Sequence, residues 1–393
     1  MIYPRKLTQK LIKEVDSNRI TVLTGMRQTG KTTLMRQVFD SIKSKNKLFL
    51  DLENPLNQKV FEEINFDNIL INLKEFGLNF DERSYVFLDE IQLVPEISRA
   101  IKYLYDHCQI KFFLTGSSSF YLKNLFPESL AGRKIVYELF PLDFKEFLVF
   151  KKKEKKFFVD FSQKAKNKNK ISFEIYKKLY EEYLTFGGFP GVVIENNKEG
   201  KKAVLEDIFK SYFEKDVKAL ADFKEIKKLR DLIILFAGRV GSKIEITKIA
   251  SEIGVSRETI YSYLGFLEKT YFVFLVPSFS KNINGEIRKA RKIYFCDTGL
   301  LNYLAKAVEG AVFENAVFQN LRDLGKVSYY EKYKGPEIDF ILDGRIALEA
   351  KIRADLRDVE KLRRMTSNLG LKNYYLITKK YSEHPKSILA IDL

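Results

Sequence analysis

One short glycine-rich segment strongly limits how the first third of the chain can fold. Gly25 and Gly30 enclose four residues and are followed by a lysine and a threonine, which is a G-x-x-x-x-G-K-T pattern. An apolar run suited to a strand, Ile20 to Thr24, precedes this segment, and a helical pattern, Lys31 to Lys43, follows it. In such a unit, backbone N–H groups and the helix N-terminus cradle phosphate oxygens. The pattern therefore predicts a binding site for a nucleoside triphosphate.

The residues of this loop have separate expected parts in binding ATP with Mg²⁺. The Lys31 ammonium should reach the β and γ phosphates, and the Thr32 hydroxyl should ligate Mg²⁺. The predicted nucleotide-binding residues are Gly25, Met26, Arg27, Gln28, Thr29, Gly30, Lys31, Thr32 and Thr33.

Two later apolar runs also end in polar residues. The run from Tyr85 leads into Asp89 and Glu90, and the run from Ile110 leads into Thr115 and three serines. Asp89 is expected in the Mg²⁺ shell, and Glu90 is expected to act as the general base that polarises the attacking water. An acidic pair on an ordinary surface turn is the alternative.

The first third alternates strand and helix patterns, which predicts a parallel sheet with helices on both faces. The fold class is therefore α/β. The expected strands are Ile20 to Thr24, Lys47 to Asp51, Tyr85 to Asp89, Ile110 to Thr115 and Lys134 to Leu139, and the expected helices are Lys31 to Lys43 and Glu96 to His107.

Helical patterns replace strands between about Phe147 and Ala237. Beyond them, Thr247 to Glu252 and a segment that starts at Ser256 are separated by Gly254, which predicts a helix-turn-helix. A strand-like YFVFLV run and a basic turn from Lys281 to Lys292 complete a winged-helix outline. The exposed positions Arg257, Glu258, Tyr261 and Ser262 would then face DNA, or a protein partner if the module serves interaction.

Near the C-terminus, two strand patterns form an expected hairpin. A three-residue loop, Asp343 to Arg345, pairs Leu342 with Ile346, whereas a two-residue turn would place Asp339 and Glu349 on opposite faces. With the three-residue loop, one face is apolar, and Asp339, Glu349 and Lys351 share the other.

Composition excludes several other kinds of chemistry. The chain has 2 cysteines and 2 histidines, too few for a disulfide framework, a Cys-rich zinc site or a histidine-based metal centre. The net charge of +16 favours a polyanionic partner. Part of it lies in the lysine-rich segment 151–170, expected to be an exposed insertion that is either a solvated surface or a binding patch. No signal peptide or membrane span is apparent, so a cytoplasmic location is expected.

Several short motifs together resemble AAA-type ATPases, and more closely the prokaryotic family that pairs such a domain with a C-terminal DUF4143 domain. They lie along almost the whole chain: the glycine-rich loop, LDEIQ (88–92), LTGSSS (114–119), LAGR (130–133), FPL (140–142) and FGGFP (186–190). The resemblance implies that Thr115 and Ser117 lie near a sensor position. It also implies that Arg133 acts as an arginine finger from its own or a neighbouring subunit; a surface ion pair is the alternative. The FGGFP turn resembles a lid motif, or is a tight turn between helices.

The hairpin resembles the PD-(D/E)xK nucleases. That resemblance implies that Asp339 and Glu349 hold Mg²⁺ and that Lys351 steadies the hydrolytic water, with Glu314 as a third carboxylate. The departure from the pattern is Glu337, which stands where a proline is expected, although Pro336 lies one residue earlier. A hairpin with incidental charges is the alternative.

Together these patterns predict a P-loop parallel-sheet domain (1–145), a helical connector with the basic insertion (146–240), a winged helix (241–295) and an α/β restriction-endonuclease-like domain (296–393). The expected function is ATP hydrolysis. The nucleotide state is expected to drive the winged-helix and nuclease-like C-terminal region, which acts on DNA. The alternative is an ATP-dependent switch that binds a protein and whose nuclease-like domain is inactive. ATP and DNA are the expected partners, a homo-oligomer is compatible with the chain, and no membrane partner is expected.

Overall fold

A computed structural model describes residues 3–94, 96–116, 132–217, 225–280, 289–332 and 335–393. The chain divides into two compact units, of which unit 1 comprises residues 1–140 with 269–271, and unit 2 comprises 141–268 with 272–393. The predicted domain boundaries at 145, 240 and 295 stay predictions. Ser117 to Ser119, Leu130 and most of the expected wing turn (281–288) lie outside the described residues.

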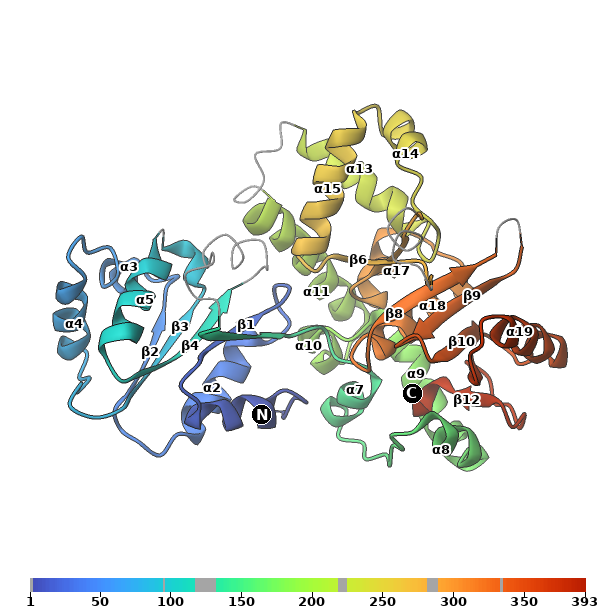
Figure 1. The fold of residues 1–393 in the computed structure, drawn as a ribbon, viewed down its shortest axis with the longest axis horizontal. Coiled ribbons are helices and arrows are strands. Elements are labelled where there is room, and N and C mark those ends of the chain that lie inside the picture. The colour runs from blue at the N-terminus through green and yellow to red at the C-terminus, as the bar shows by residue number, and fades with distance from the viewer. Residues whose placement is uncertain (1–2, 95, 117–131, 218–224, 281–288, 333–334) are drawn as a thin grey trace. The chain divides into compact units, whose positions relative to one another are not determined.

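Unit 1 is built on a five-stranded parallel sheet with the order β2-β3-β4-β1-β5 (Figure 1). Its strands are β1 (Ile20–Thr24), β2 (Lys47–Asp51), β3 (Ser84–Asp89), β4 (Ile110–Gly116) and β5 (Lys134–Glu138). Its helices are α1 (Thr8–Lys13), η1 (Glu14–Asp16), α2 (Lys31–Ser41), α3 (Pro55–Lys59), α4 (Phe66–Glu75), η2 (Ile91–Leu93) and α5 (Ile97–His107). The predicted strands are thereby confirmed to within one residue at either end.

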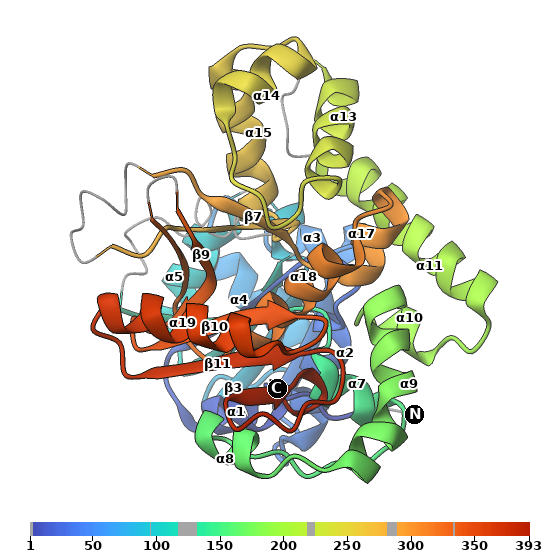
Figure 2. The same cartoon turned by 90° about the vertical axis from the view of Figure 1, so that its right-hand side faces the viewer.

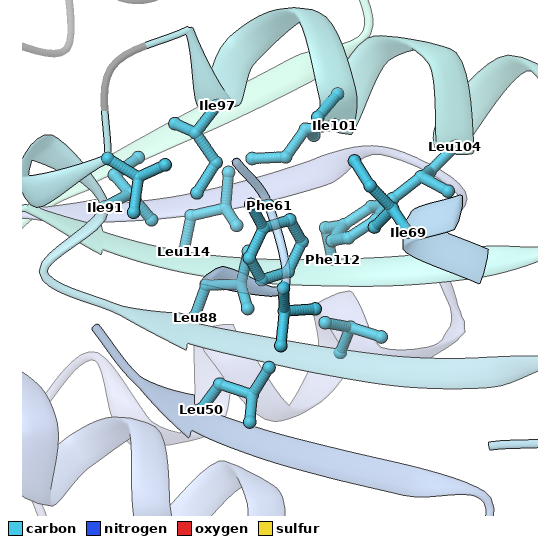
Figure 3. Packing of buried hydrophobic residues seen from close by; sticks show 14 of the residues in the cluster. Leu50, Phe61, Ile69, Leu88, Ile91, Ile97, Ile101, Leu104, Phe112 and Leu114 are labelled. Carbon is cyan, nitrogen blue, oxygen red and sulfur yellow. The ribbon is translucent and has the colours of Figure 1, made fainter. Parts of the chain in front are cut away.

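Two apolar layers hold this sheet, one on each face. Figure 3 shows the first, in which Ile69 of α4 and Ile101 of α5 pack on Leu88 and Phe112 of the central strands. On the other face, α1 and α2 cover Leu23, Phe87 and Phe113. Because both faces are covered, apolar side chains dominate the buried strands β1, β3 and β4, and Asp89 and Thr115 lie where β3 and β4 end.

Unit 2 is mainly helical before its own sheet begins. Its first helices are α7 (Phe144–Phe150), α8 (Phe161–Lys166), α9 (Lys170–Phe186), α10 (Pro190–Ile194), α11 (Lys198–Ser211), a π-helical turn η4 (Tyr212–Val217) and α13 (Ile226–Ala237). The expected loss of strands between Phe147 and Ala237 is confirmed among the described residues. No helix in the described ranges combines the length and apolar character that a membrane crossing requires.

The predicted helix-turn-helix elements are present. Helix α14 (Ile246–Ile253) ends at Gly254, whose φ of 73° is left-handed, and the Ser256 hydroxyl caps α15 (Arg257–Lys269) by accepting from Thr259 N at 3.1 Å. In α15, Ile260, Leu264 and Leu267 are buried, whereas Tyr261 is 62% exposed. Strands β6 (Val273–Val276) and β7 (Lys292–Phe295) then pair antiparallel. Figure 2 shows α14 and α15 beside α13.

A second five-stranded sheet ends the chain, with the order β12-β11-β10-β9-β8. Strands β8, β9 and β10 are antiparallel neighbours, and β10, β11 and β12 are parallel. The strands and helices of this part are α17 (Thr298–Leu304), α18 (Glu309–Leu321), β8 (Val327–Glu331), β9 (Glu337–Leu342), β10 (Ile346–Lys351), α19 (Leu356–Asn368), β11 (Asn373–Thr378), β12 (Ser387–Leu389) and η5 (Ala390–Asp392).

The lysine-rich segment is not the wholly exposed insertion that was expected. Lys155 pairs with Asp392 at 2.6 Å, and its side chain is only 5% exposed. Lys164 is buried, and Lys168 donates to the Ser387 hydroxyl at 2.9 Å. The cause is packing, because α8 lies against β12 and the aliphatic stems of these lysines are covered while their ammonium groups find acceptors.

The FGGFP segment forms a tight turn between α9 and α10. A Cβ at Gly187 would lie 2.0 Å from an Asp297 carboxylate oxygen, and one at Gly188 would lie 2.0 Å from the Leu142 carbonyl oxygen. The buried Asp297 caps α17 and accepts from Gly188 N at 2.6 Å, and burial raises its pKa to about 6. Gly187 and Gly188 therefore allow this turn to pack closely against the segments that contain Asp297 and Leu142, all within unit 2.

Candidate functional site

The predicted nucleotide site lies at one edge of the unit 1 sheet. Strands β1 and β3 flank β4 and run parallel to it, so the carboxyl ends of all three strands meet at a common edge. The glycine-rich loop follows β1, Asp89 ends β3, and Thr115 lies at the end of β4. Open α/β sheets bind ligands at this edge.

The loop has the backbone geometry that its glycines allow. Gly25 has a φ of 151°, and a Cβ there would lie 2.1 Å from the Leu139 carbonyl oxygen. Gly30 has a left-handed φ of 94° and is the N-cap of α2. Gln28 also has a positive φ, 61°. Because the loop turns in this way, the first turn of α2 faces the edge of the sheet.

Three side chains hold the loop together. Lys31 is buried, and its Nζ donates to the carbonyl oxygens of Gly25 at 3.0 Å and Met26 at 3.1 Å. The buried Thr29 hydroxyl donates to the Met26 carbonyl at 2.8 Å, so this side chain braces the loop from within. Arg5, which the sequence analysis missed, donates to the Thr29 and Phe140 carbonyls, both at 2.8 Å. No local pattern marks Arg5, since its partners are distant in sequence.

The carboxylate of Asp89 lies between two threonine hydroxyls. Thr115 Oγ1 donates to Asp89 Oδ1, and Thr32 also contacts this carboxylate. Burial raises the pKa of Asp89, and the hydrogen bonds from Thr115 and Thr32 oppose that rise. Thr32 and Asp89 are thus brought together, as two oxygen ligands of one Mg²⁺ ion would be. Thr115 does not need to touch the nucleotide to matter, because it positions Asp89.

Glu90 is held beside this group by an unusual backbone conformation. Its φ of 57° and ψ of 47° are left-handed, which is uncommon for a residue other than glycine. Its backbone N–H donates to Thr115 Oγ1 at 3.0 Å, and its carboxylate accepts from Gln92 Nε2. Strained backbone of this kind gathers at functional sites. The half-buried Glu90 carboxylate therefore has a defined orientation next to Asp89.

We expect Thr115→Val to lower ATP turnover, because the buried Asp89 would lose a donor and Glu90 N an acceptor. A hydrogen bond to a charged group contributes about 1.5–3 kcal/mol, so kcat should fall roughly 10-fold to 100-fold. Thr115→Ser is the matched control and should retain most activity. Steady-state ATPase assays check this prediction. Equal rates for the valine variant and the wild type would show that Thr115 has no role in ATP turnover.

Arg133 does not reach the nucleotide site of its own chain. It directly precedes β5, and its carbonyl accepts from Ile20 N at the start of β1, which is the opposite edge of the sheet. Its guanidinium pairs with Asp106 at 2.7 Å, near the end of α5. The expectation of a catalytic Arg133 within one subunit is therefore wrong, because the five residues of β1 separate it from the loop. Action on a neighbouring subunit stays a prediction.

The C-terminal hairpin has the predicted register. Leu342 lies opposite Ile346 and Phe340 opposite Leu348, which places Asp339 and Glu349 on one face. The loop uses positive φ at Asp343 (49°) and Gly344 (65°). The same face also carries Ile341 and Ala347, which pack with α19. Both faces of the hairpin are buried.

Carboxylates and lysines interact closely around Asp339. Burial raises its pKa to about 8, and Glu314 and Glu349 add to the rise while Lys292 opposes it. Lys292, which the sequence analysis did not single out, contacts Glu337 and lies 3.4 Å from Glu314. A lysine in the otherwise apolar β7 was the available signal.

On the other side of this cluster, Lys351 Nζ lies 2.8 Å from Glu349 Oε1. The buried Glu349 Oε2 has no hydrogen-bond partner in the described residues, so it could accept a cation. Against that, no group of three or more His, Cys, Asp or Glu side chains within the described ranges is arranged as a metal site. The residues therefore fit a cation held by Asp339 and Glu349 with water, rather than a complete protein cage.

The parallel sheet, the glycine-rich loop and the Asp89–Glu90 edge define the N-terminal part as a P-loop ATPase domain of the AAA class. A profile of the AAA domain family matches residues 17–148. A second profile, a domain of unknown function (DUF8612), matches residues 177–310. The match in that region is thus to DUF8612 and not to the DUF4143 that the motifs resemble.

The chain belongs to the same family as an uncharacterized protein of Haemophilus influenzae, with which it is 30% identical over 401 residues, 98% of this chain and 94% of that protein. It is 29% identical to the uncharacterized protein MJ1544 of Methanocaldococcus jannaschii over 394 residues, 95% of this chain and 85% of that protein. Among solved structures, the Walker-type ATPase PABY2304 of Pyrococcus abyssi matches with a TM-score of 0.43 and 16% identity, over 77% of this chain and 96% of that one.

Proposed function

We propose that this protein hydrolyses ATP with Mg²⁺ and uses the nucleotide state to drive a C-terminal region that acts on DNA. The observation that carries the ATPase part is the meeting of Thr32, Asp89, Thr115 and Glu90 at one sheet edge. Lys31 would hold the β and γ phosphates, and Thr32 and Asp89 would hold Mg²⁺, which offsets phosphate charge. Glu90 accepts the proton of the attacking water.

The DNA part of the proposal rests on two features of unit 2. First, Asp339, Glu349 and Lys351 lie on one hairpin face, as the resemblance to PD-(D/E)xK nucleases requires. Second, α15 presents exposed Arg257 and Tyr261 after a left-handed Gly254 turn, which supports a winged-helix reader of DNA. The proposal includes a winged helix at residues 241–295 and a nuclease-like domain at residues 296–393. It also includes the resemblance to the family with a DUF4143 domain.

We expect Arg257→Ala to weaken DNA binding, because the exposed guanidinium would contact a phosphate. Removal of one such contact should lower the salt slope of log K by about 1. Glu258→Gln, on the same helical turn, is the matched control and should not lower affinity. Fluorescence anisotropy with duplex DNA over a range of salt concentrations measures this. Unchanged affinity in an Arg257→Ala, Tyr261→Ala double variant would assign the module to protein interaction.

A second candidate is a regulatory ATPase that binds a protein and whose nuclease-like domain is inactive. The observation that favours it is that both lysines near Asp339 already form ion pairs, Lys292 with Glu314 and Glu337 and Lys351 with Glu349. ATP turnover stimulated by a protein fraction, without affinity for DNA, distinguishes this candidate from the first.

A further inference from the structure

A cavity of 780 Å³ lies in unit 2, between α9 and the loops that follow β10 and β11. Basic side chains dominate its lining: Lys177, Lys178, Arg353, Lys379 and Lys380, against the single acidic Glu181. Its volume is within the range of about 300–1,000 Å³ that is usual for small-molecule sites. The cavity therefore has the size and the charge to take a compact anion.

The basic residues of this cavity have different parts. Lys379 is nearly buried, and its Nζ lies 2.8 Å from Glu181 and 2.6 Å from Glu309, so its charge is balanced within the protein. Lys178 and Arg353 are exposed, and neither side chain forms a hydrogen bond or an ion pair with the described residues. They come from different walls, α9 and the loop after β10. Arginine forks match phosphate oxygens, and a nearby ammonium adds a point charge.

Three aromatic side chains also line the cavity. Phe173 and Tyr180 of α9 are buried, and Tyr381 is half-buried. The rings of Phe173 and Tyr381 lie 5.8 Å apart at 57°. Aromatic rings beside cationic groups are the combination that binds nucleotides without reading sequence, because every base has a face that can stack. A simple inorganic anion would use the charges but not these rings.

The cavity also lies next to the strand that carries the candidate nuclease residues. Both neighbouring strands, β10 and β11, run parallel and end at this edge, where α/β sheets bind ligands. Lys379 N donates to the Lys351 carbonyl at 3.1 Å, and Lys380 N donates to the Ile352 carbonyl at 2.9 Å. Backbone hydrogen bonds thus join the wall of the cavity to the end of β10.

We propose that this cavity, the β10–β11 pocket, binds a nucleotide through its phosphate and base. The nucleotide is the phosphorylated end of a DNA strand or a free nucleoside monophosphate. The strand-end form rests on the proposed action on DNA, whereas the free form does not. Arg353 and Lys178 contact the phosphate, and Tyr381 contacts the base. This site is separate from the glycine-rich loop, which lies in unit 1.

Binding is measured in the full-length Lys31→Ala variant, so that the unit 1 loop does not contribute. The probes are a fluorescent oligothymidylate with a terminal phosphate at either end, the same strand without that phosphate, and methylanthraniloyl-AMP. We expect Arg353→Ala to weaken binding of a phosphorylated probe at least about tenfold, the usual effect of losing a charge-assisted contact. Lys372→Ala, at the other end of β11, is the matched control and should not change binding.

Tyr381 supplies an independent measure of base contact. Tyr381→Phe should retain affinity and Tyr381→Ala should lose roughly tenfold, because stacking needs the ring and not the hydroxyl. If Arg353→Ala weakens binding of the phosphorylated strands alone, the ligand is the end of a DNA strand. If it weakens binding of methylanthraniloyl-AMP alone, the ligand is a free nucleotide. Unchanged binding of every probe in a folded Lys178→Ala, Arg353→Ala variant overturns the inference. DNA stimulation of wild-type ATPase is a separate readout, so the proposed function can fail without the pocket failing.

Discussion

Glu90→Gln is expected to bind ATP like the wild type and to lose hydrolysis. The amide is nearly the size of the carboxylate, so the Gln92 contact and the left-handed backbone at this position should persist. It cannot accept a proton from water, and loss of a general base lowers rates about 100-fold to 10,000-fold. Single-turnover ATP hydrolysis and fluorescent nucleotide binding measure the two properties separately.

Lys31→Ala provides the contrasting variant. It removes the only loop ammonium aimed at the phosphates, so binding and turnover should both be lost. Glu96→Gln, at an exposed carboxylate that pairs with Arg99, is the matched control for Glu90→Gln and should turn over ATP normally. If Glu90→Gln hydrolysed ATP at the wild-type rate, Glu90 would not be the base.

Asp339→Asn and Lys351→Ala are each expected to remove metal-dependent cleavage of DNA and to leave ATP hydrolysis largely intact. Asp339 would hold the cation, and Lys351 would stabilise the water or the developing phosphate charge. Without either group, cleavage should fall at least about 100-fold, since metal-ion catalysis contributes several kcal/mol. The two activities separate because Asp339 is in unit 2 and the ATP site is in unit 1.

Glu331→Gln is the control for this pair, because Glu331 lies in the same sheet but its carboxylate pairs with Lys243 at 2.8 Å. Plasmid and oligonucleotide substrates with Mg²⁺ or Mn²⁺, with and without ATP, test the activity. If the wild type cleaves no nucleic acid in any of these conditions, the hairpin geometry stands and the nuclease activity does not.

Local sequence patterns were sufficient for the strands of the first sheet, the glycine-rich loop and the hairpin register. Each depends on near neighbours: Gly25 and Gly30 within one loop, or the parity that puts Asp339 opposite Glu349. Residues whose partners are distant in sequence could not be found in this way. Arg5 contacts Phe140, and Lys292 contacts Glu314 and Glu337 only after the chain has folded.

Arg133 and the lysine-rich segment show the same limit from the other side. The motif around Arg133 resembles one that carries a catalytic arginine, but only the parallel pairing of β5 with β1 reveals that it lies at the far edge. The lysine-rich composition predicts that Lys155 and Lys168 are exposed. In the structure, their ammonium groups contact acceptors near β12 and in the C-terminal turn. In both cases, tertiary contacts decide the role.

The most direct test of the proposed function is the steady-state ATPase rate of the wild-type protein with Mg²⁺, measured without DNA and with saturating duplex or single-stranded DNA. If the nucleotide state is coupled to a DNA-acting region, DNA should raise the rate several-fold, and Arg257→Ala should reduce this stimulation without changing the basal rate. A rate that no DNA changes, in a protein that binds no DNA at low salt, would contradict the proposal.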